Sequence, residues 1–254
     1  MTDFPTAEAA EIKVSFVGAE AEEAFDALEL DRDDGRRRAI HFWDRPRRSA
    51  GAEITLPLLE QNVILRLRRD REGSGSKREA DLTVKLRPCP RLPSPWLRER
   101  EGEQWEFTVE EDRPGPAFKP VLAASLQAER EFEAALDAER GSFGRLLAEP
   151  QRELLDAVGL TDGRLEDLTA LGPVHAVRWK QEWDELPRTV TIEEWTTDDE
   201  LRFLEVSVRA DLEDAPEVQE LLTRALRERD LTPPLTGETK TRAVMTALAR
   251  TLGL

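Results

Sequence analysis

The sequence predicts an α+β fold of antiparallel strands with helices around them, and its charge pattern raises a closed β-barrel as the alternative to an open sheet. Three observations favour this architecture. Most predicted strands alternate charged residues with Leu, Val or Ile, so each strand has one polar and one apolar face. The strands of the last third are joined by only a few residues, which implies hairpins. Cations recur in pairs at two-residue spacing, and a closed barrel would turn them inward, where a ligand, other charges or water must neutralise them.

Composition limits the class of protein. The chain has 254 residues, of which 39% are hydrophobic, enough for a buried core. A formal net charge of −16 argues against a general nucleic-acid or anionic-membrane binder, so any anion site must be local. Cys89 is the only cysteine, and the sequence has neither a signal-like start nor a long apolar run. We therefore expect a cytoplasmic protein, and the Arg-rich and Ala-rich composition resembles that of high-GC bacteria.

A basic antiparallel hairpin is predicted in the first half of the chain. Arg66 and Arg68 share one face of its first strand, and Lys85 and Arg87 share one face of the second. Gly and Ser residues at 73–76 let the chain reverse between them. For this hairpin alone, the solvated face of an ordinary sheet is the better explanation of the charges.

The remaining elements follow from periodicity and from Gly, Pro and Asp at their ends. Further strands are predicted at 11–16, 36–44, 104–110, 174–183, 188–195 and 201–209. Helices are predicted at 21–30, 121–140, 151–158, 215–229 and 238–252. One late strand carries Arg178 and Lys180 on one face, and the first and last strands carry Glu11 and Glu205. Converging Arg and Lys pairs suit a polyanion, and carboxylates beside them suit a hard cation that bridges it.

Taken in order, these motifs resemble the CYTH or triphosphate tunnel metalloenzyme family. The matching segments are Glu-Ile-Lys at 11–13, His-Phe-Trp-Asp at 41–44, Leu-Arg-Leu-Arg at 65–68, Thr-Val-Lys-Leu-Arg at 83–87, Glu106, Val-Arg-Trp-Lys at 177–180, Glu-Val-Ser at 205–207 and Lys240. The resemblance implies a single tunnel domain over 1–254, built on eight antiparallel strands, with a helical insertion at about 117–160. It also implies binding of triphosphate-containing small molecules with Mg²⁺ or Mn²⁺.

The resemblance further implies roles for individual residues. The phosphate chain would be held by Lys13, Arg66, Arg68, Lys85, Arg87, Arg178, Lys180 and Lys240. Glu11, Glu106 and Glu205 would hold the metal ion, with Glu193 as a substitute, and Lys13, Glu11 and Glu205 would act in catalysis. We therefore predict a triphosphatase that hydrolyses inorganic triphosphate or a triphosphorylated small molecule.

Two positions depart from the family's pattern. Ala9 stands where the first Glu of the N-terminal motif is expected, and Ser207 stands where the late strand would carry its second carboxylate. Two alternatives therefore stay open. One is a polyphosphate- or nucleotide-binding module that has lost metal-dependent turnover. The other is an adenylate cyclase of the same family, which needs base recognition that no motif supplies. No nucleic-acid or membrane partner is expected.

Overall fold

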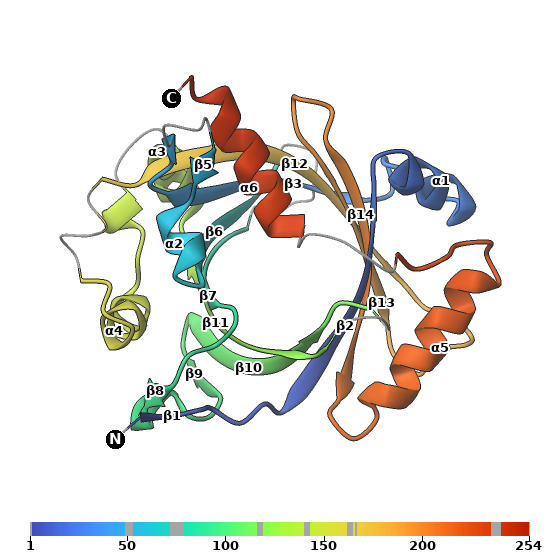
Figure 1. Cartoon of the computed structure of the whole chain (residues 1–254), viewed down its shortest axis with the longest axis horizontal. Coiled ribbons are helices and arrows are strands. Elements are labelled where there is room, and N and C mark those ends of the chain that lie inside the picture. Colours follow the sequence, from blue (N-terminus) through green and yellow to red (C-terminus); the bar gives the residue numbers. More distant parts are fainter. Residues whose placement is uncertain are drawn as a thin grey trace.

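The computed structural model describes residues 2–48, 53–71, 79–115, 119–139, 143–161, 165, 167–234 and 240–253. Within these ranges, nine strands form a closed ring, because β10 pairs with β11 as well as with β2 (Figure 1). In ring order the strands are β11 (Val121–Arg130), β7 (Ala80–Leu86), β6 (Val63–Asp70), β3 (Arg36–Asp44), β12 (Thr169–Gln181), β13 (Val190–Thr196), β14 (Arg202–Asp211), β2 (Ala9–Val17) and β10 (Trp105–Arg113).

The other strands are short and lie outside the ring. β9 (Arg100–Gly102) extends the sheet beside β10, and two small ladders pair β1 (Thr2–Asp3) with β8 (Leu92–Pro93) and β4 (Arg47–Arg48) with β5 (Ile54–Thr55). The helices are α1 (Ala19–Ala27), α2 (Pro57–Glu60), α3 (Phe132–Glu139), α4 (Glu149–Ala157), α5 (Ala215–Arg227) and α6 (Lys240–Thr251), with 3-10 turns η1 (Ser94–Trp96) and η2 (Phe143–Arg145). No helix of the described ranges combines the length and apolar character needed to cross a membrane.

The predicted α+β tunnel with surrounding helices is confirmed, with two corrections. The ring has nine strands instead of eight, and one of its pairings, β2 with β10, is parallel. The predicted helix over 121–140 is wrong in its first half, where β11 lies between β10 and β7. This segment is rich in Ala, which favours helices, but its apolar residues also alternate, and pairing with two neighbours decides in favour of the strand. The predicted hairpin tip at 73–76 lies outside the described residues.

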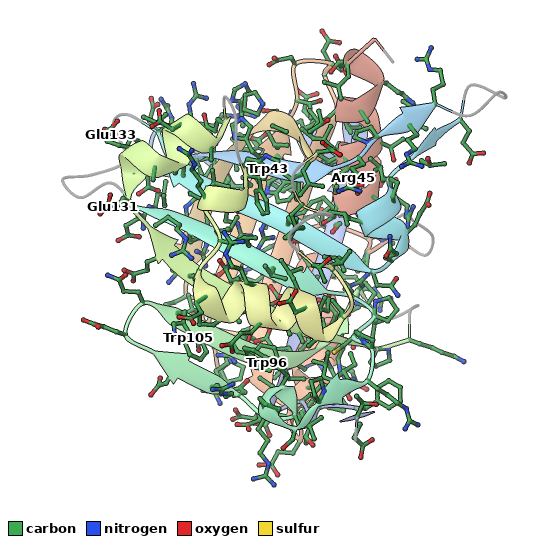
Figure 2. The ribbon with its side chains drawn as sticks, turned by 90° about the vertical axis from the view of Figure 1, so that its left-hand side faces the viewer. Trp43, Arg45, Trp96, Trp105, Glu131 and Glu133 are labelled. Carbon is green, nitrogen blue, oxygen red and sulfur yellow. The ribbon has the colours of Figure 1, made fainter. Side chains whose placement is uncertain are left out.

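The outer face of the barrel carries most of the apolar core. α4 crosses the strands between Trp43 and Trp96, which belong to the same core (Figure 2). The amide of Gln151 on α4 is fully buried and donates to the backbone oxygens of Leu82, at 2.7 Å, and Leu126, at 3.2 Å. On the other side of the ring, α1 and α5 cover the outer face of β2 and β14 (Figure 1). Because the apolar faces of the strands point outward, their polar faces line the barrel interior.

One end of the interior is apolar and is covered by α6. Val244, Met245 and Leu248 of this helix pack with Phe42 and Trp195 in a separate core. Phe42 is the register partner of Arg66, and residues directly opposite on paired strands share a face, so this core continues the same inner surface as the cations. The helix α6 therefore packs against the apolar end of the interior, beside its charged part.

Candidate functional site

The barrel encloses a cavity of about 780 Å³ whose described lining includes nine cationic and seven acidic side chains. This local balance is positive in a chain whose formal net charge is −16. The cavity brings together most of the predicted residues, namely Lys13, Arg66, Arg68, Lys85, Arg87, Arg178, Lys240, Glu11, Glu106, Glu193 and Glu205. Lys180 lines a second cavity, of about 410 Å³. The anion-binding character of the interior is thus local, as the composition requires.

Strand register explains why the basic hairpin faces the cavity. Arg66 on β6 lies opposite Thr83 on β7, and Lys85 lies opposite Ile64 on β6 and Ser125 on β11. Opposite residues of paired strands share a face, and that face is the inner one because the leucines of the hairpin pack outside. The charges of this hairpin therefore do not form a solvated sheet face.

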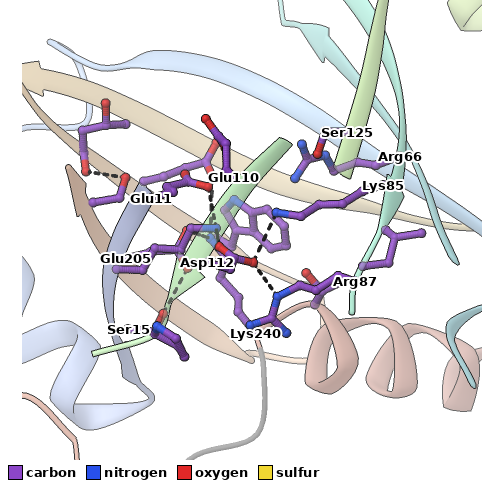
Figure 3. Close-up of a pocket in the computed structure, with 18 of the residues that line it drawn as sticks. Glu11, Ser15, Arg66, Lys85, Arg87, Glu110, Asp112, Ser125, Glu205 and Lys240 are labelled. Carbon is purple, nitrogen blue, oxygen red and sulfur yellow. Dashed lines mark hydrogen bonds and ion pairs between the residues drawn. The ribbon is translucent and has the colours of Figure 1, made fainter. Parts of the chain in front are cut away.

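The centre of the charge network is Asp112, a residue that the sequence analysis missed. Its Oδ1 lies 2.7 Å from Lys13 Nζ, its Oδ2 lies 3.3 Å from Lys85 Nζ, and Arg87 Nε donates to the same oxygen (Figure 3). Asp112 on β10 is the register partner of Glu11 on β2, and Lys13 Nζ also lies 2.7 Å from Glu11 Oε2. One buried carboxylate thus gathers three cations from two walls of the tunnel.

Asp112 was missed because the predicted strand ended at residue 110, shortly before a proline. The alternation that began at Glu106 continues through Thr108 and Glu110 to Asp112, and all four side chains line the cavity. Their common two-residue spacing is the signal that would have found Asp112.

The pKa values of this network reflect competition between burial and attraction. Burial opposes ionisation of Asp112, but Lys13, Lys85 and Arg87 outweigh it, and the pKa of its carboxyl group is lowered. Burial likewise opposes the charged form of Lys13, but Asp112 and Glu11 raise the pKa of its ammonium group. Burial and then repulsion by Lys13 lower the pKa of Lys85. The attraction by Asp112 and Glu11 does not offset these two effects. Lys13 and Asp112 therefore form a firmly ionised pair.

The three carboxylates predicted to hold a metal ion do not form a site. Glu106 lies six residues before Asp112 on β10, about 20 Å along the strand. Glu205 accepts from Ser15 Oγ at 3.1 Å and from Lys240 Nζ at 2.8 Å, and Glu11 is paired with Lys13. Among the residues described, no three His, Cys, Asp or Glu side chains are close enough together to share a metal. The positions of Glu11, Glu106 and Glu205 therefore do not fit a shared metal site.

Lys240 enters the cavity from the first turn of α6. Its Nζ lies 2.8 Å from Glu205, 3.6 Å from Glu193 and 3.9 Å from the centre of the Trp195 ring. Burial opposes ionisation of Glu193, yet Arg68, Lys240 and Arg66 lower the pKa of its carboxyl group to about 2. Ion pairs of Lys240 thus connect α6 to the lining of the cavity.

Arg66 differs from these paired cations. Its guanidinium group faces the cavity, its Nε is buried with no hydrogen-bond partner, and no carboxylate of the described chain lies within ion-pair distance of it. Burial, with repulsion from Arg68, lowers the pKa of the group to about 10. Figure 3 shows Arg66, Lys85 and Arg87 reaching inward from one wall, while Glu11 and Glu205 come from the opposite wall.

No family model matches the sequence, and neither does any curated protein. Solved structures do match. A protein from Hippeastrum, described as a putative adenylyl cyclase that reveals a dominant triphosphatase activity, shares 16% identity with a TM-score of 0.55, over 93% of this chain and 96% of that one. A protein from Bacillus halodurans, described as a putative adenylate cyclase, shares 12% identity with a TM-score of 0.56, over 93% of this chain and 97% of that one. Over nearly its whole length, the chain therefore has the tunnel fold of these proteins.

Proposed function

We propose that this chain binds a triphosphate-containing small molecule inside the tunnel and hydrolyses its phosphoanhydride bond. The observation that carries the proposal is Arg66, a cation facing the cavity with a buried Nε and no ion-pair partner among the described residues. An unpaired buried charge is costly, and a phosphate group would neutralise it with charge-assisted hydrogen bonds. Guanidinium groups match phosphate oxygens in geometry.

The other cations would extend this grip along the tunnel. Arg68 and Lys85 lie on the same hairpin as Arg66, and Lys13 faces them from β2. Phosphoryl transfer spreads negative charge over the oxygens of the transferred group, so cations that are already held in position stabilise the transition state. Asp112 holds Lys13, Lys85 and Arg87 in place before the ligand arrives.

The dependence on Mg²⁺ or Mn²⁺ stays a prediction. Glu11, Glu106 and Glu205 do not come together, so these residues do not form a metal site by themselves in the described structure. The structural neighbour described as having a dominant triphosphatase activity supports the reaction class.

A binding module without turnover is the second candidate. It is favoured by one observation: Glu11, Glu205 and Asp112 are each engaged by a lysine. An adenylate cyclase has less support. Trp195 is the single aromatic residue among the described lining of the main cavity; it is fully buried and lies against Lys240.

A phosphate-release assay with a parallel thermal-unfolding assay tests the proposal. The substrates are inorganic triphosphate, thiamine triphosphate, ATP and a longer polyphosphate, each with and without Mn²⁺. Release from a triphosphate identifies a hydrolase, and the arms with and without Mn²⁺ decide the metal requirement. Thermal stabilisation without release identifies the binding module. Neither release nor stabilisation with any of the four compounds overturns triphosphate binding itself.

A further inference from the structure

The second cavity continues the first at one mouth of the tunnel. The two share six lining residues, namely Glu11, Glu110, Arg178, Thr191, Ser207 and Arg209. The second cavity adds Lys180, Arg188 and Thr189, which lie where β12 ends and β13 begins. We call this opening the Lys180 mouth. A linear ligand in the main cavity therefore has a continuous path toward Lys180.

The four cations among the described lining of the Lys180 mouth differ in their ion pairs, and Arg178 lies opposite Glu193, which attracts it from beyond ion-pair distance. Arg209 pairs with Glu110 at 2.7 Å and Arg188 pairs with Asp211 at 2.7 Å. By contrast, Arg178 and Lys180 form no ion pair with the part of the chain that the structure describes. They are two residues apart on β12, so they share a face and their backbones are about 7 Å apart.

The neighbours of Lys180 explain why it is unpaired. Its register partner on β13 is Thr191, and the partner of Thr191 on β14 is Ser207, so two small hydroxyl side chains lie beside it. Ser207 is one of the two positions where the family pattern would place a carboxylate. The other is Ala9, whose register partners are Glu110 and Asp211, near the same mouth. Neither position supplies a carboxylate, so the described lining of the second cavity has four cationic side chains against two acidic ones, and this balance favours an anion.

We infer that the Lys180 mouth binds the phosphate groups beyond the third in a linear inorganic polyphosphate. This inference rests on the proposed function, because the first three groups would lie in the main cavity near Arg66. Two cations and two hydroxyl groups suit phosphate oxygens. A nucleoside would find no stacking partner there, since no described residue lining the second cavity is aromatic.

Binding measurements on Lys180→Ala test the inference, with Lys119→Ala as the matched control. Both lysines are exposed, and Lys119 lines neither cavity. The probes are inorganic triphosphate, ATP and a polyphosphate of defined length of about ten phosphate groups, titrated calorimetrically at one fixed salt concentration. Lys180→Ala should weaken polyphosphate binding about tenfold more than it weakens the binding of triphosphate or ATP. Lys119→Ala should change none of the three.

The comparison within one variant removes a statistical ambiguity. A polyphosphate chain contains several overlapping triphosphate segments, and this alone raises its apparent affinity for any triphosphate site. The increase is the same in the wild type and in Lys180→Ala, so it cancels when the two proteins are compared. Equal weakening of all three probes, selective weakening of ATP, or no weakening at all would each overturn the inference. Failure of the wild type to bind triphosphate would instead overturn the proposed function, so the two failures are distinguishable.

Discussion

Lys13 Nζ lies 2.7 Å from Asp112 Oδ1 and 2.7 Å from Glu11 Oε2, so one ammonium group joins two carboxylates on adjacent parallel strands. In this chain, the carboxylates at the centre of the tunnel hold cations in place. The arrangement leads to predictions about stability as well as ligand binding.

Replacing Asp112 by Asn should destabilise the free protein. Lys13, Lys85 and Arg87 would then repel one another with less negative charge to balance them, and loss of one partner from a buried ion pair costs about 3–5 kcal/mol. The free energy of unfolding, measured by urea denaturation, should fall accordingly. Added triphosphate should restore more stability in Asp112→Asn than in the wild type. An unchanged urea midpoint would contradict this account.

Arg66→Ala should weaken triphosphate binding by about tenfold or more without destabilising the fold. The side chain has no ion-pair partner in the described structure, so its removal breaks no internal contact of this kind, whereas a lost charge-assisted hydrogen bond weakens binding by about tenfold or more. Calorimetric titration measures the affinity, and thermal unfolding checks the fold. Arg98→Ala, at an exposed position outside the cavity, is the control. A folded Arg66→Ala protein that binds triphosphate with wild-type affinity would show that the tunnel is not the binding site.

The lowered pKa of Glu193 predicts that the folded protein loses stability at acid pH. Although burial opposes its ionisation, Arg68 and Lys240 lower the pKa of its carboxyl group from the ordinary value of 4.5 to about 2. The unfolded chain therefore binds this proton more readily, so the contribution is complete above about pH 4.5 and is lost as the pH falls toward about 2. Its size is on the order of 3 kcal/mol.

The measurement compares the wild type with Glu193→Gln from about pH 6 to about pH 3. The wild type should be the more stable protein at the upper end, and the difference in unfolding free energy should narrow steadily as the pH falls. A difference in unfolding free energy that stays constant over this range would show that the ionised form of Glu193 does not stabilise the protein.

Gln151 should anchor α4 to the barrel. Its amide donates to Leu82 and Leu126, and its Oε1 accepts from the backbone of Ala148 at 3.0 Å. Gln151→Ala leaves buried carbonyl oxygens without donors, which costs about 1–3 kcal/mol. Chemical denaturation should show this loss. Glu153→Ala, at an exposed position of the same helix, should change stability by less than about 0.5 kcal/mol, and equal effects of the two substitutions would refute the anchor.

The basic hairpin was predictable because a two-residue period fixes the face of a strand wherever the strand lies. The period puts the cations of each strand on one face, and closure of the ring turns that face, with Arg66 and Lys85, toward the cavity. The strand β11 was not predictable, because Ala-rich sequence suits a helix and only pairing with β7 and β10 forces extension. The metal-ligand set failed for a different reason. A local motif does not say how far along the tunnel each strand places its carboxylate, and Glu106 lies far from Asp112 on the same face.

The position of β2 has a consequence for the order of folding. Its two neighbours in the ring are β10 and β14, and the hydrogen bond from Ser15 to Glu205 joins residues 190 positions apart in sequence. Contacts between such distant segments carry a large loop-closure cost and form late. We therefore expect the walls that carry Lys13 and Glu205 to meet only after most of the chain has been ordered. Until that moment the cations of the hairpin have no opposing wall, and the cavity has no interior in which to hold an anion.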